Sequence, residues 1–466
     1  MGFAHSGRNG VKAQLQDRFP GAFGRFGSLG ELRKAVFVPE PDAGPRVVQR
    51  SEVVICLDGN VLMQAIPQSV KTLEEHASFF TSALRKALAS AAVVVVVYDE
   101  PALLTEAKIE EMAKRDSARA KREVPCSEDL ALPRDDGYTL EQLDSMPDAS
   151  GLRGVRAARG RFFDAVGARA MQWLRPTIRD WCRSGFQTAL VFDGLDPRGA
   201  RRGLGVARQA RIWGSDAAVC AALAHAPLGE GDLKLAAIEN AVLAAAATTE
   251  KPLGDTRLFV ASTIDTDNFA LELLEHARRK EAGGDRGKRV QVVFAMREIA
   301  RSEEESASYL VCDVRQLYGQ VLSEVWPLRQ EPTPTEARAA IALLVAGWAL
   351  CGCDFTKVPG LNASLTFEAV SSLIKQDPDA LHAIRAAWAG GRDEVLAIER
   401  TLRRLVMLCA ACLGERKGAR QATKSALANV ESVPLRRGCY TISYWCFNEP
   451  KGGVADFGFG GLCGGW

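Results

Sequence analysis

The stretch that decides the fold is "AAVVVVVYD", residues 91–99, in which five consecutive valines run into a tyrosine and an aspartate. β-Branched residues favour strands, and an apolar run without polar alternation is typical of a strand that is buried on both faces. Such strands belong to parallel sheets that are covered by helices on both sides. A long helical pattern over about residues 73–89 precedes the run. The stretch therefore predicts an α/β fold with a mostly parallel sheet.

Five further β-rich runs occur along the chain, most of them separated by helical patterns. They are "EVVICLD" (52–58), "QTALVF" (187–192), "RLFVAS" (257–262), "RVQVVF" (289–294) and "SYLVCDV" (308–314). We expect one domain over residues 1–330, with a variable insertion at about 124–180 in which a polar, loop-like segment to about residue 150 is followed by an arginine-rich helix. We expect residues 331–466 to form a helical region that ends in a tail rich in glycine and aromatic residues.

Composition excludes several classes of protein. No stretch of the 466 residues approaches the roughly 20 apolar residues of a membrane span, and the N-terminus lacks the apolar segment of a secretory signal. We therefore expect a protein of the nucleus or cytoplasm that is neither secreted nor bound to a membrane. The 12 cysteines are scattered, which favours reduced thiols, and five histidines offer little for structural zinc.

Positive charge is concentrated locally although the net charge is only +2. Residues 151–211 contain 13 arginines against four aspartates, and a second basic run, "KRDSARAKR", covers 114–122. Such runs are either solvated helix faces or tracks for phosphate groups. The sequence leaves both interpretations open.

Acidic residues follow several of the predicted strands, where ligands bind in open α/β sheets. These strand-end acids are Asp58, Asp99, Asp193 and the pair Asp265 and Asp267. A second close pair, Glu230 and Asp232, lies in "GEGDLKL" (229–235), and Asp354 follows a long apolar helical run in a turn with glycine.

Each of these acids taken alone is most simply a solvated or structural residue. Two residues at i and i+2 lie on the same side of an extended chain but on different sides of a helix, so each pair can share a cation only where the chain is extended. Together, two such pairs and several strand-end acids favour a metal site. Oxygen ligands without nearby histidine or cysteine select Mg²⁺ or Mn²⁺.

In this order the motifs resemble those of the flap endonuclease and 5′→3′ exonuclease superfamily, whose catalytic domain is PIN-like. "VVICLDGNVLMQ" and "VVVVVYDEPALLTEAKIEEMAKRDSAR" are similar to its first two metal strands, and "STIDTDNFAL" to its DxD motif. "GEGDLKL" resembles the GEGEHKI motif of the exoribonuclease branch, and "LCGCDFTKVPGL" the flap endonuclease motif GCDY(T)…IPG. The resemblance implies seven metal-binding acids: Asp58, Asp99, Glu230, Asp232, Asp265, Asp267 and Asp354.

The resemblance implies hydrolysis of phosphodiester bonds with two Mg²⁺ or Mn²⁺ ions. The first four acids would hold one ion, and the last three the other ion or its waters. Lys108 and Arg115, seven residues apart on one helical face, would neutralise charge on the phosphate, and Gly2 would lie at the nucleic acid as in the family's N-terminus. Asp193, followed by Arg201 and Arg208, imitates the second metal strand; we prefer Asp99, which lies 41 residues after Asp58.

The resemblance makes a structure-specific 5′ nuclease in DNA replication or repair the favoured function, acting on DNA with a 5′ flap or 5′ end. The helix-hairpin-helix expected after Asp354 lacks its later glycine, which weakens the case for duplex binding. A 5′→3′ exonuclease on RNA or single strands, and a catalytically silent scaffold or nucleic-acid-binding protein, remain alternatives. No clear sliding-clamp peptide lies near the C-terminus, and the degenerate hairpin and aromatic tail are similar to relatives encoded by large DNA viruses.

Overall fold

A computed structural model describes residues 11–38, 45–67, 69–100, 140–153, 156–195, 212–248, 252–263, 267–283, 289–298, 308–352, 365–382 and a few positions between 384 and 409. The chain divides into two compact units, and we describe each separately. The first reaches Glu324, and the second begins at Val325.

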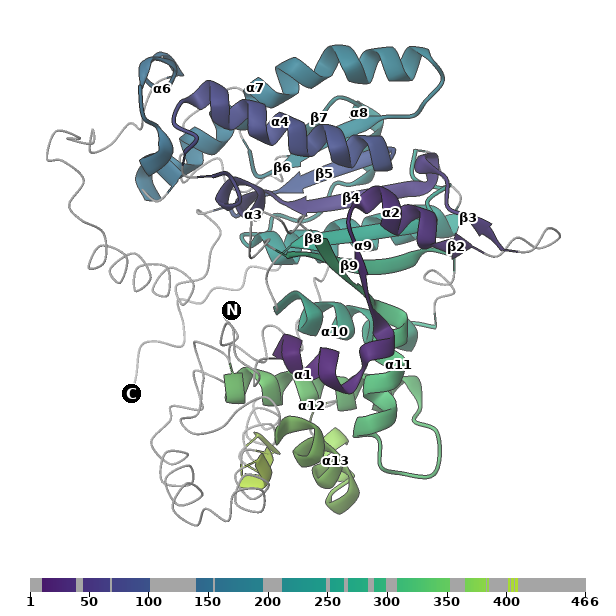
Figure 1. The fold of residues 1–466 in the computed structure, drawn as a ribbon. Coiled ribbons are helices and arrows are strands. Elements are labelled where there is room, and N and C mark those ends of the chain that lie inside the picture. Colours follow the sequence, from purple (N-terminus) through teal and green to yellow (C-terminus); the bar gives the residue numbers. More distant parts are fainter. Residues whose placement is uncertain are drawn as a thin grey trace, which may run out of the picture. The chain divides into compact units, whose positions relative to one another are not determined.

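The first unit is built on an eight-stranded sheet in the order β1-β10-β9-β8-β4-β5-β6-β7 (Figure 1). The five central strands are parallel: β4 (Val53–Asp58), β5 (Val93–Val97), β6 (Ala189–Asp193), β8 (Leu258–Thr263) and β9 (Gln291–Glu298). Antiparallel strands complete both edges: β1 (Phe23–Phe26), β10 (Ser308–Asp313) and β7 (Ile212–Gly214). The predicted α/β fold with a mostly parallel sheet is confirmed.

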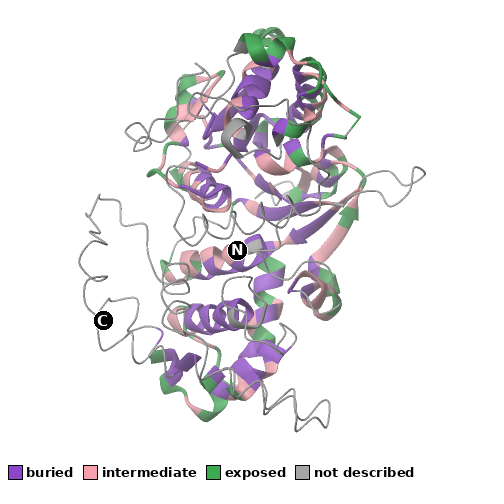
Figure 2. Ribbon diagram, turned by 90° about the vertical axis from the view of Figure 1, so that its left-hand side faces the viewer, coloured by how far each residue is buried: buried purple, intermediate pink, exposed green. Residues whose placement is uncertain are grey.

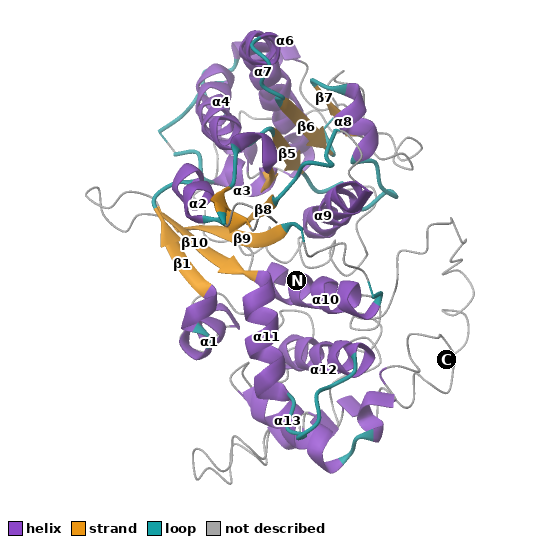
Figure 3. Ribbon diagram, turned by 90° about the vertical axis from the view of Figure 1, so that its right-hand side faces the viewer, coloured by secondary structure: helices purple, strands orange, loops and turns teal. Residues whose placement is uncertain are grey.

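Helices cover both faces of this sheet (Figure 3). On one face lie α2 (Leu29–Ala35), α4 (Leu73–Ser90) and α7 (Arg156–Arg183). On the other lie α8 (Ala217–Ala222) and α9 (Gly231–Thr248), and α10 (Asp267–Glu281) packs on α9. The remaining elements of this unit are α1 (Val11–Arg18), α3 (Gly59–Gln64), α6 (Leu140–Ser145), α11 (Val314–Val325) and a hairpin of β2 (Phe37–Val38) and β3 (Arg46–Val47).

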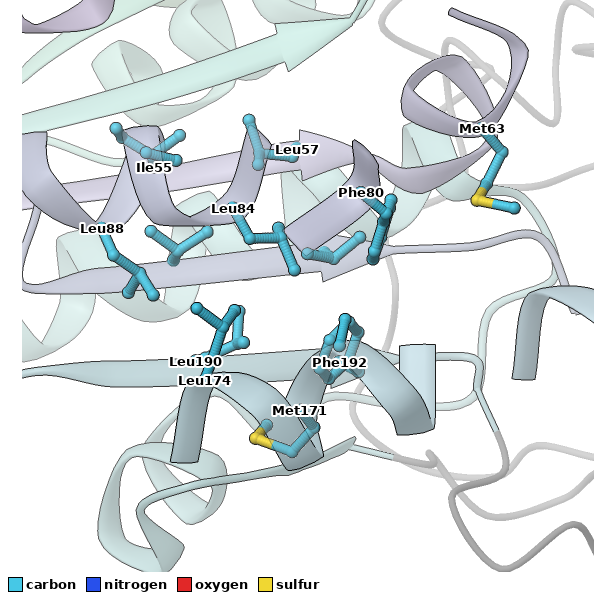
Figure 4. Close-up of a cluster of buried hydrophobic side chains, with 14 of the residues drawn as sticks. Ile55, Leu57, Met63, Phe80, Leu84, Leu88, Met171, Leu174, Leu190 and Phe192 are labelled. Atoms are coloured by element: carbon cyan, nitrogen blue, oxygen red, sulfur yellow. The ribbon is translucent and has the colours of Figure 1, made fainter. Parts of the chain in front are cut away.

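Alternation along the buried strands divides the core into two layers, because successive side chains of a strand point to opposite faces. Ile55 and Leu57 lie on the face covered by α4, with Phe80 and Leu84, and Leu190 and Phe192 lie beside Met171 and Leu174 of α7 (Figure 4). Apolar residues of α9, such as Ile238 and Val242, are buried on the opposite face. Each fully buried side chain of this kind contributes roughly 1.5–3 kcal/mol. Figure 2 shows the buried strands and the exposed outer sides of the helices.

The insertion predicted at about 124–180 is only partly correct. The expected loop contains α6, whose Leu143 is fully buried, and the N–H of Ala149 donates to the carbonyl of Lys71. Most of α7 also falls in this range, yet it forms a layer of the core with Phe162 and Leu174 buried. The reason is that its apolar residues recur at helical spacing between the arginines. The helical face expected to carry Lys108 and Arg115 lies outside the described residues.

The second unit is helical where the structure describes it. Its main elements are α12 (Pro334–Gly352) and α13 (Thr366–Gln376). Trp348 of α12 is fully buried and packs edge-on against Phe367 of α13, with ring centroids 5.8 Å apart. Among the described residues, no helix has both the length and the apolar character needed to cross a membrane.

Candidate functional site

The order of the parallel strands reverses between β4 and β8. Successive parallel strands are added on one side of β4 as β5 and β6, whereas β8 and β9 lie on its other side. In open α/β sheets, ligands bind at the carboxyl ends of the strands where the order reverses in this way. The residues at the carboxyl ends of β4, β5 and β8 are therefore the first to examine.

Asp58 ends β4 at this switch point and caps α3. Its Oδ1 accepts hydrogen bonds from the N–H groups of Asn60 (2.9 Å) and Val61 (3.3 Å). Its Oδ2 accepts one from the hydroxyl of Thr263 at the end of β8, at 3.3 Å. The Asp58 carboxylate is thus fixed by the first turn of α3 and by the end of the neighbouring strand β8.

Asp99 lies just beyond β5 and joins this strand to the "GEGDLKL" segment. Its Oδ1 accepts a 2.8 Å hydrogen bond from the N–H of Gly231, and the N–H of Glu100 donates to the carbonyl of Gly229 at 2.6 Å. The approach of β5 to β4 is also close, because a Cβ at Gly59 would lie 2.3 Å from the ring of Tyr98. Only glycine fits at position 59 without displacing that ring.

Asp232 lies in the first turn of α9, where the helix dipole favours an acidic side chain. Its Oδ1 accepts a 2.7 Å hydrogen bond from the Nδ2 of Asn268. Asn268 is the second residue of α10 and only 1% exposed. The contact therefore orients the Asp232 carboxylate and ties the beginnings of the two helices together.

Electrostatic repulsion connects Asp58 with two other predicted acids, Asp99 and Asp232. The pKa of Asp58 is raised well above its usual range, first by burial and then by the negative charges of Asp232 and Asp99. Such repulsion among carboxylates is what a bound cation relieves. The carboxylate oxygens of these acids are ligands of the kind that Mg²⁺ and Mn²⁺ prefer.

The close pair Glu230 and Asp232 has a different geometry from the one expected. Sequence analysis required an extended chain at this pair, but α9 begins at Gly231, so Asp232 is helical and Glu230 precedes the helix. The pair does not meet this condition, because the helix-favouring run after Gly231 extends back to the glycine itself. Glu230 is only 6% exposed, and the charges that act on Asp58 are those of Asp232 and Asp99.

Asp193, the alternative to Asp99, ends β6 in a different environment. It is 1% exposed; one oxygen lies 2.7 Å from the Nε2 of His225, and the other 3.2 Å from the Nζ of Lys234. Burial alone would raise the pKa of Asp193, but the His225 hydrogen bond and the charges of Lys234 and His225 together hold it below its usual value. Both of its oxygens are thus bound to basic side chains of the protein.

Several predicted site residues lie outside the described residues: Gly2, Lys108, Arg115, Arg201, Arg208, Asp265 and Asp354. Asp267 begins α10, and its side chain is not described. Within the described part of the chain, no group of three or more histidine, cysteine, aspartate or glutamate side chains is arranged to hold a metal ion. Asp99 and Asp232 thus act on Asp58 through their charges, but the described carboxylates are not arranged as a metal-binding group.

Sequence analysis missed four residues that support the site: Thr263, Asn268, His225 and Lys234. Three of them, Thr263, Lys234 and Asn268, stand inside the quoted motifs, within two positions of Asp265, Asp232 and Asp267. Their partners, however, come from strands and helices distant in the chain, and a single sequence carries no signal for such contacts.

Comparison with known proteins gives no matching family model and no similar curated protein. The resemblance to the flap endonuclease superfamily therefore stays a prediction. The geometry of the site carries the functional argument.

Proposed function

We propose that the chain is a 5′ nuclease with a PIN-like fold that requires a divalent metal and hydrolyses phosphodiester bonds. The observation that carries the proposal is the convergence of Asp58, Asp99 and Asp232, from three separate elements, at the switch point of a parallel sheet. Burial, followed by the negative charges of Asp232 and Asp99, raises the pKa of Asp58. Charges placed so unfavourably are typical of a functional site.

The chemistry of the donors fits Mg²⁺ or Mn²⁺, which prefer carboxylate oxygens. Asp58, Asp99 and Asp232 would hold one ion, while Asp265, Asp267 and Asp354 would serve a second ion or its waters. Bound ions of this kind lower the pKa of a water and stabilise the leaving oxygen. Thr263 and Asn268 would orient the carboxylates through the hydrogen bonds described above.

Contacts of the described residues favour Asp99 over Asp193 as the second ligand. Asp99 acts on Asp58 through its charge, whereas Asp193 is held by Lys234 and His225. A metal at Asp193 would have to displace two buried basic groups, which is costly. Lys108 and Arg115, on the stretch after Asp99, would then face the scissile phosphate, and Arg201 and Arg208 would contribute to binding nucleic acid.

We propose DNA with a 5′ flap or 5′ end as the substrate, with RNA as the alternative that the "GEGDLKL" segment supports. Both substrates have a 5′ end and a negatively charged phosphodiester backbone, which the arginines of residues 151–211 would attract in a salt-dependent manner. The two hypotheses are distinguished by measuring cleavage of both substrates with the same preparation.

The test uses the purified full chain with 5′-flap DNA and with 5′-monophosphate RNA, in Mg²⁺ and in EDTA. We expect Mg²⁺-dependent cleavage that Asp232→Asn abolishes, because asparagine keeps the size of the side chain but loses its charge. Asp313→Asn is the matched control, since Asp313 ends the antiparallel strand β10 and accepts hydrogen bonds from Gln291 and Gln316.

Loss of cleavage in both variants would mean that a general loss of structure, not the site, explains the result. Retained cleavage in Asp232→Asn would refute the metal site. Binding of either nucleic acid by the wild type without cleavage in any metal would instead support a catalytically silent binding protein.

A further inference from the structure

Asp193, His225 and Lys234 form a buried ionic group next to the candidate site. The Asp193 carboxylate lies between the Nε2 of His225 (2.7 Å) and the Nζ of Lys234 (3.2 Å). The side chains of Asp193, Lys234 and His225 are 1%, 3% and 9% exposed. Charged groups are rarely so deeply buried unless they are paired, and the proposed chemistry uses none of the three.

The chain positions of these residues are the reason to assign them a role. His225 precedes Glu230 and Lys234 follows Asp232, so the Asp193 carboxylate holds both ends of the segment that carries the acidic pair. The backbone of Asp193 reaches the other side of the site as well, because its carbonyl accepts a 2.9 Å hydrogen bond from the N–H of Tyr98, next to Asp99. One residue therefore contacts both segments whose acids must meet.

The group leaves little room for adjustment. Gly194 has a φ of +91°, and a Cβ there would lie 2.7 Å from both Lys234 Nζ and the carbonyl oxygen of Tyr98. His225 is also fixed at both ring nitrogens, because its Nδ1 lies 2.7 Å from the carbonyl of Ala226. A change in the ionic group therefore has to move the 225–234 segment.

We propose that Asp193, His225 and Lys234 act as a positioning clamp that sets Glu230 and Asp232 against Asp99 and Asp58. The inference rests on the proposed nuclease function and deepens it. The clamp touches neither metal nor substrate; it acts through the 225–234 segment and the hydrogen bond from Gly231 to Asp99. Catalytic groups displaced by about 1 Å lose on the order of 10²-fold in rate.

A merely structural ion pair makes a different prediction from a positioning clamp. Loss of a structural pair lowers stability but leaves the turnover number of the folded protein unchanged. Loss of the clamp lowers kcat in the folded protein while KM changes little, because substrate is held mainly by other residues. It also weakens the Gly231–Asp99 hydrogen bond, which is visible as faster exchange of backbone amides in the 226–233 segment.

The experiment compares the full-length wild type with Lys234→Met, His225→Leu and His225→Gln below their unfolding temperatures. Glutamine can still donate a hydrogen bond toward Asp193, whereas leucine cannot. The two variants at position 225 have side chains of similar size, so a difference between them reports the hydrogen bond to Asp193. Arg46→Met is the control: it breaks the Arg46–Glu52 ion pair at the opposite end of β4. Readouts are kcat and KM in Mg²⁺ and hydrogen exchange of the 226–233 amides.

We expect Lys234→Met and His225→Leu to lower kcat about 10²-fold, with KM within about threefold and faster exchange of the 226–233 amides. His225→Gln should recover most of both losses, and Arg46→Met should change neither. Unchanged kcat in folded Lys234→Met and His225→Leu would overturn the clamp, with or without faster exchange. If the wild type cleaves neither substrate, the proposed function fails, and unchanged exchange in these variants would separately overturn the clamp.

Discussion

The N–H of Gly231 donates a 2.8 Å hydrogen bond to Oδ1 of Asp99, although the two residues are 132 positions apart in the chain. The bond joins the end of β5 to the beginning of α9. An asparagine at position 99 would keep the Oδ1 acceptor for this bond but would lose the negative charge. The substitution Asp99→Asn therefore separates the structural role of Asp99 from its electrostatic role.

Asp99→Asn should leave the fold intact, abolish metal-dependent cleavage and stabilise the metal-free protein at pH 7–8 by about 0.5–1 kcal/mol. The folded-state pKa of Asp58 is raised, partly by the charge of Asp99. An acid with a raised folded pKa costs stability as the pH rises above its unfolded pKa of about 3.9. Urea denaturation of both proteins at pH 5 and pH 8 in EDTA measures the effect; a gain that is equal at both values would contradict this origin.

Mg²⁺ or Mn²⁺ should raise the melting temperature of the wild type, and EDTA should reverse the effect. A ligand that binds only the folded state stabilises it by mass action, and here it also relieves the repulsion at Asp58. The shift should be larger at pH 8 than at pH 5, because protons compete with the metal for the carboxylates. Differential scanning fluorimetry of wild type, Asp232→Asn and Asp313→Asn tests this; a shift that survives in Asp232→Asn would place the metal elsewhere.

Gly194→Ala should destabilise the protein by about 2–4 kcal/mol, from a strained backbone together with a steric clash. Its φ is +91°, and the added Cβ would lie 2.7 Å from Lys234 Nζ and Tyr98 O. Gly185→Ala is the control for the backbone alone, since Gly185 has a φ of +83° and nothing within 4 Å of the added Cβ. Gly185→Ala should lower the free energy of unfolding by only about 1 kcal/mol. If chemical denaturation shows the same loss of stability in both variants, the added Cβ at Gly194 does not cause a steric clash.

Glu272→Gln should stabilise the protein at pH 8 by about 1 kcal/mol or more. Burial, followed by the charge and hydrogen bond of Glu239, raises the pKa of Glu272 well above its usual range. The wild type therefore loses stability as the pH rises above the unfolded value of about 4.3, whereas glutamine keeps a donor toward Glu239 and does not ionise. The matched urea titrations are run at pH 5 and pH 8.

Glu275→Gln, one turn away on α10, should have the opposite effect. Burial would raise the pKa of Glu275, but the charge and hydrogen bond of Arg278 and the amide of Asn240 hold it below its usual value. Its ionised form stabilises the fold above the unfolded pKa, and that stability is lost as the pH falls. Glu275→Gln should be less stable than the wild type by about 1 kcal/mol at pH 7. If Glu272→Gln and Glu275→Gln both stabilise the protein, the pKa values of the two glutamates are not shifted in opposite directions.

The central strands were predictable because each contains an uninterrupted run of apolar residues, which indicates a strand buried on both faces. Five valines in a row, and the runs that end at Asp58 and Thr263, leave few alternatives to a strand between two layers of helices. The edges were not predictable: β1 has the sequence "FGRF" and β7 has "IWG", too short and too mixed to distinguish from loops. The edge strands are held by pairing with their neighbours, which periodicity does not reveal.

The site was predictable to the level of single acids but not of their contacts. The strand-end rule selected Asp58 and Asp99, but it selected Asp193 equally, because all three follow buried strands. Only the spatial neighbours distinguish them: Asp193 faces Lys234 and His225, and Asp99 faces Gly231. Similarly, the helical position of Asp232 depends on where α9 begins, which glycines on both sides of Glu230 leave open.

The hydrogen bond from Thr263 to Asp58 can form only late in the synthesis of the first unit. The strands β4, β5 and β6 leave the ribosome well before β8, because Thr263 follows Asp58 by 205 positions. Domains begin to fold as they emerge, so a nascent chain can form part of the sheet before β8 has been made. Such an incomplete chain would already contain Asp58, Asp99 and Asp232, but it would lack Thr263 and Asn268, whose hydrogen bonds orient the carboxylates of Asp58 and Asp232.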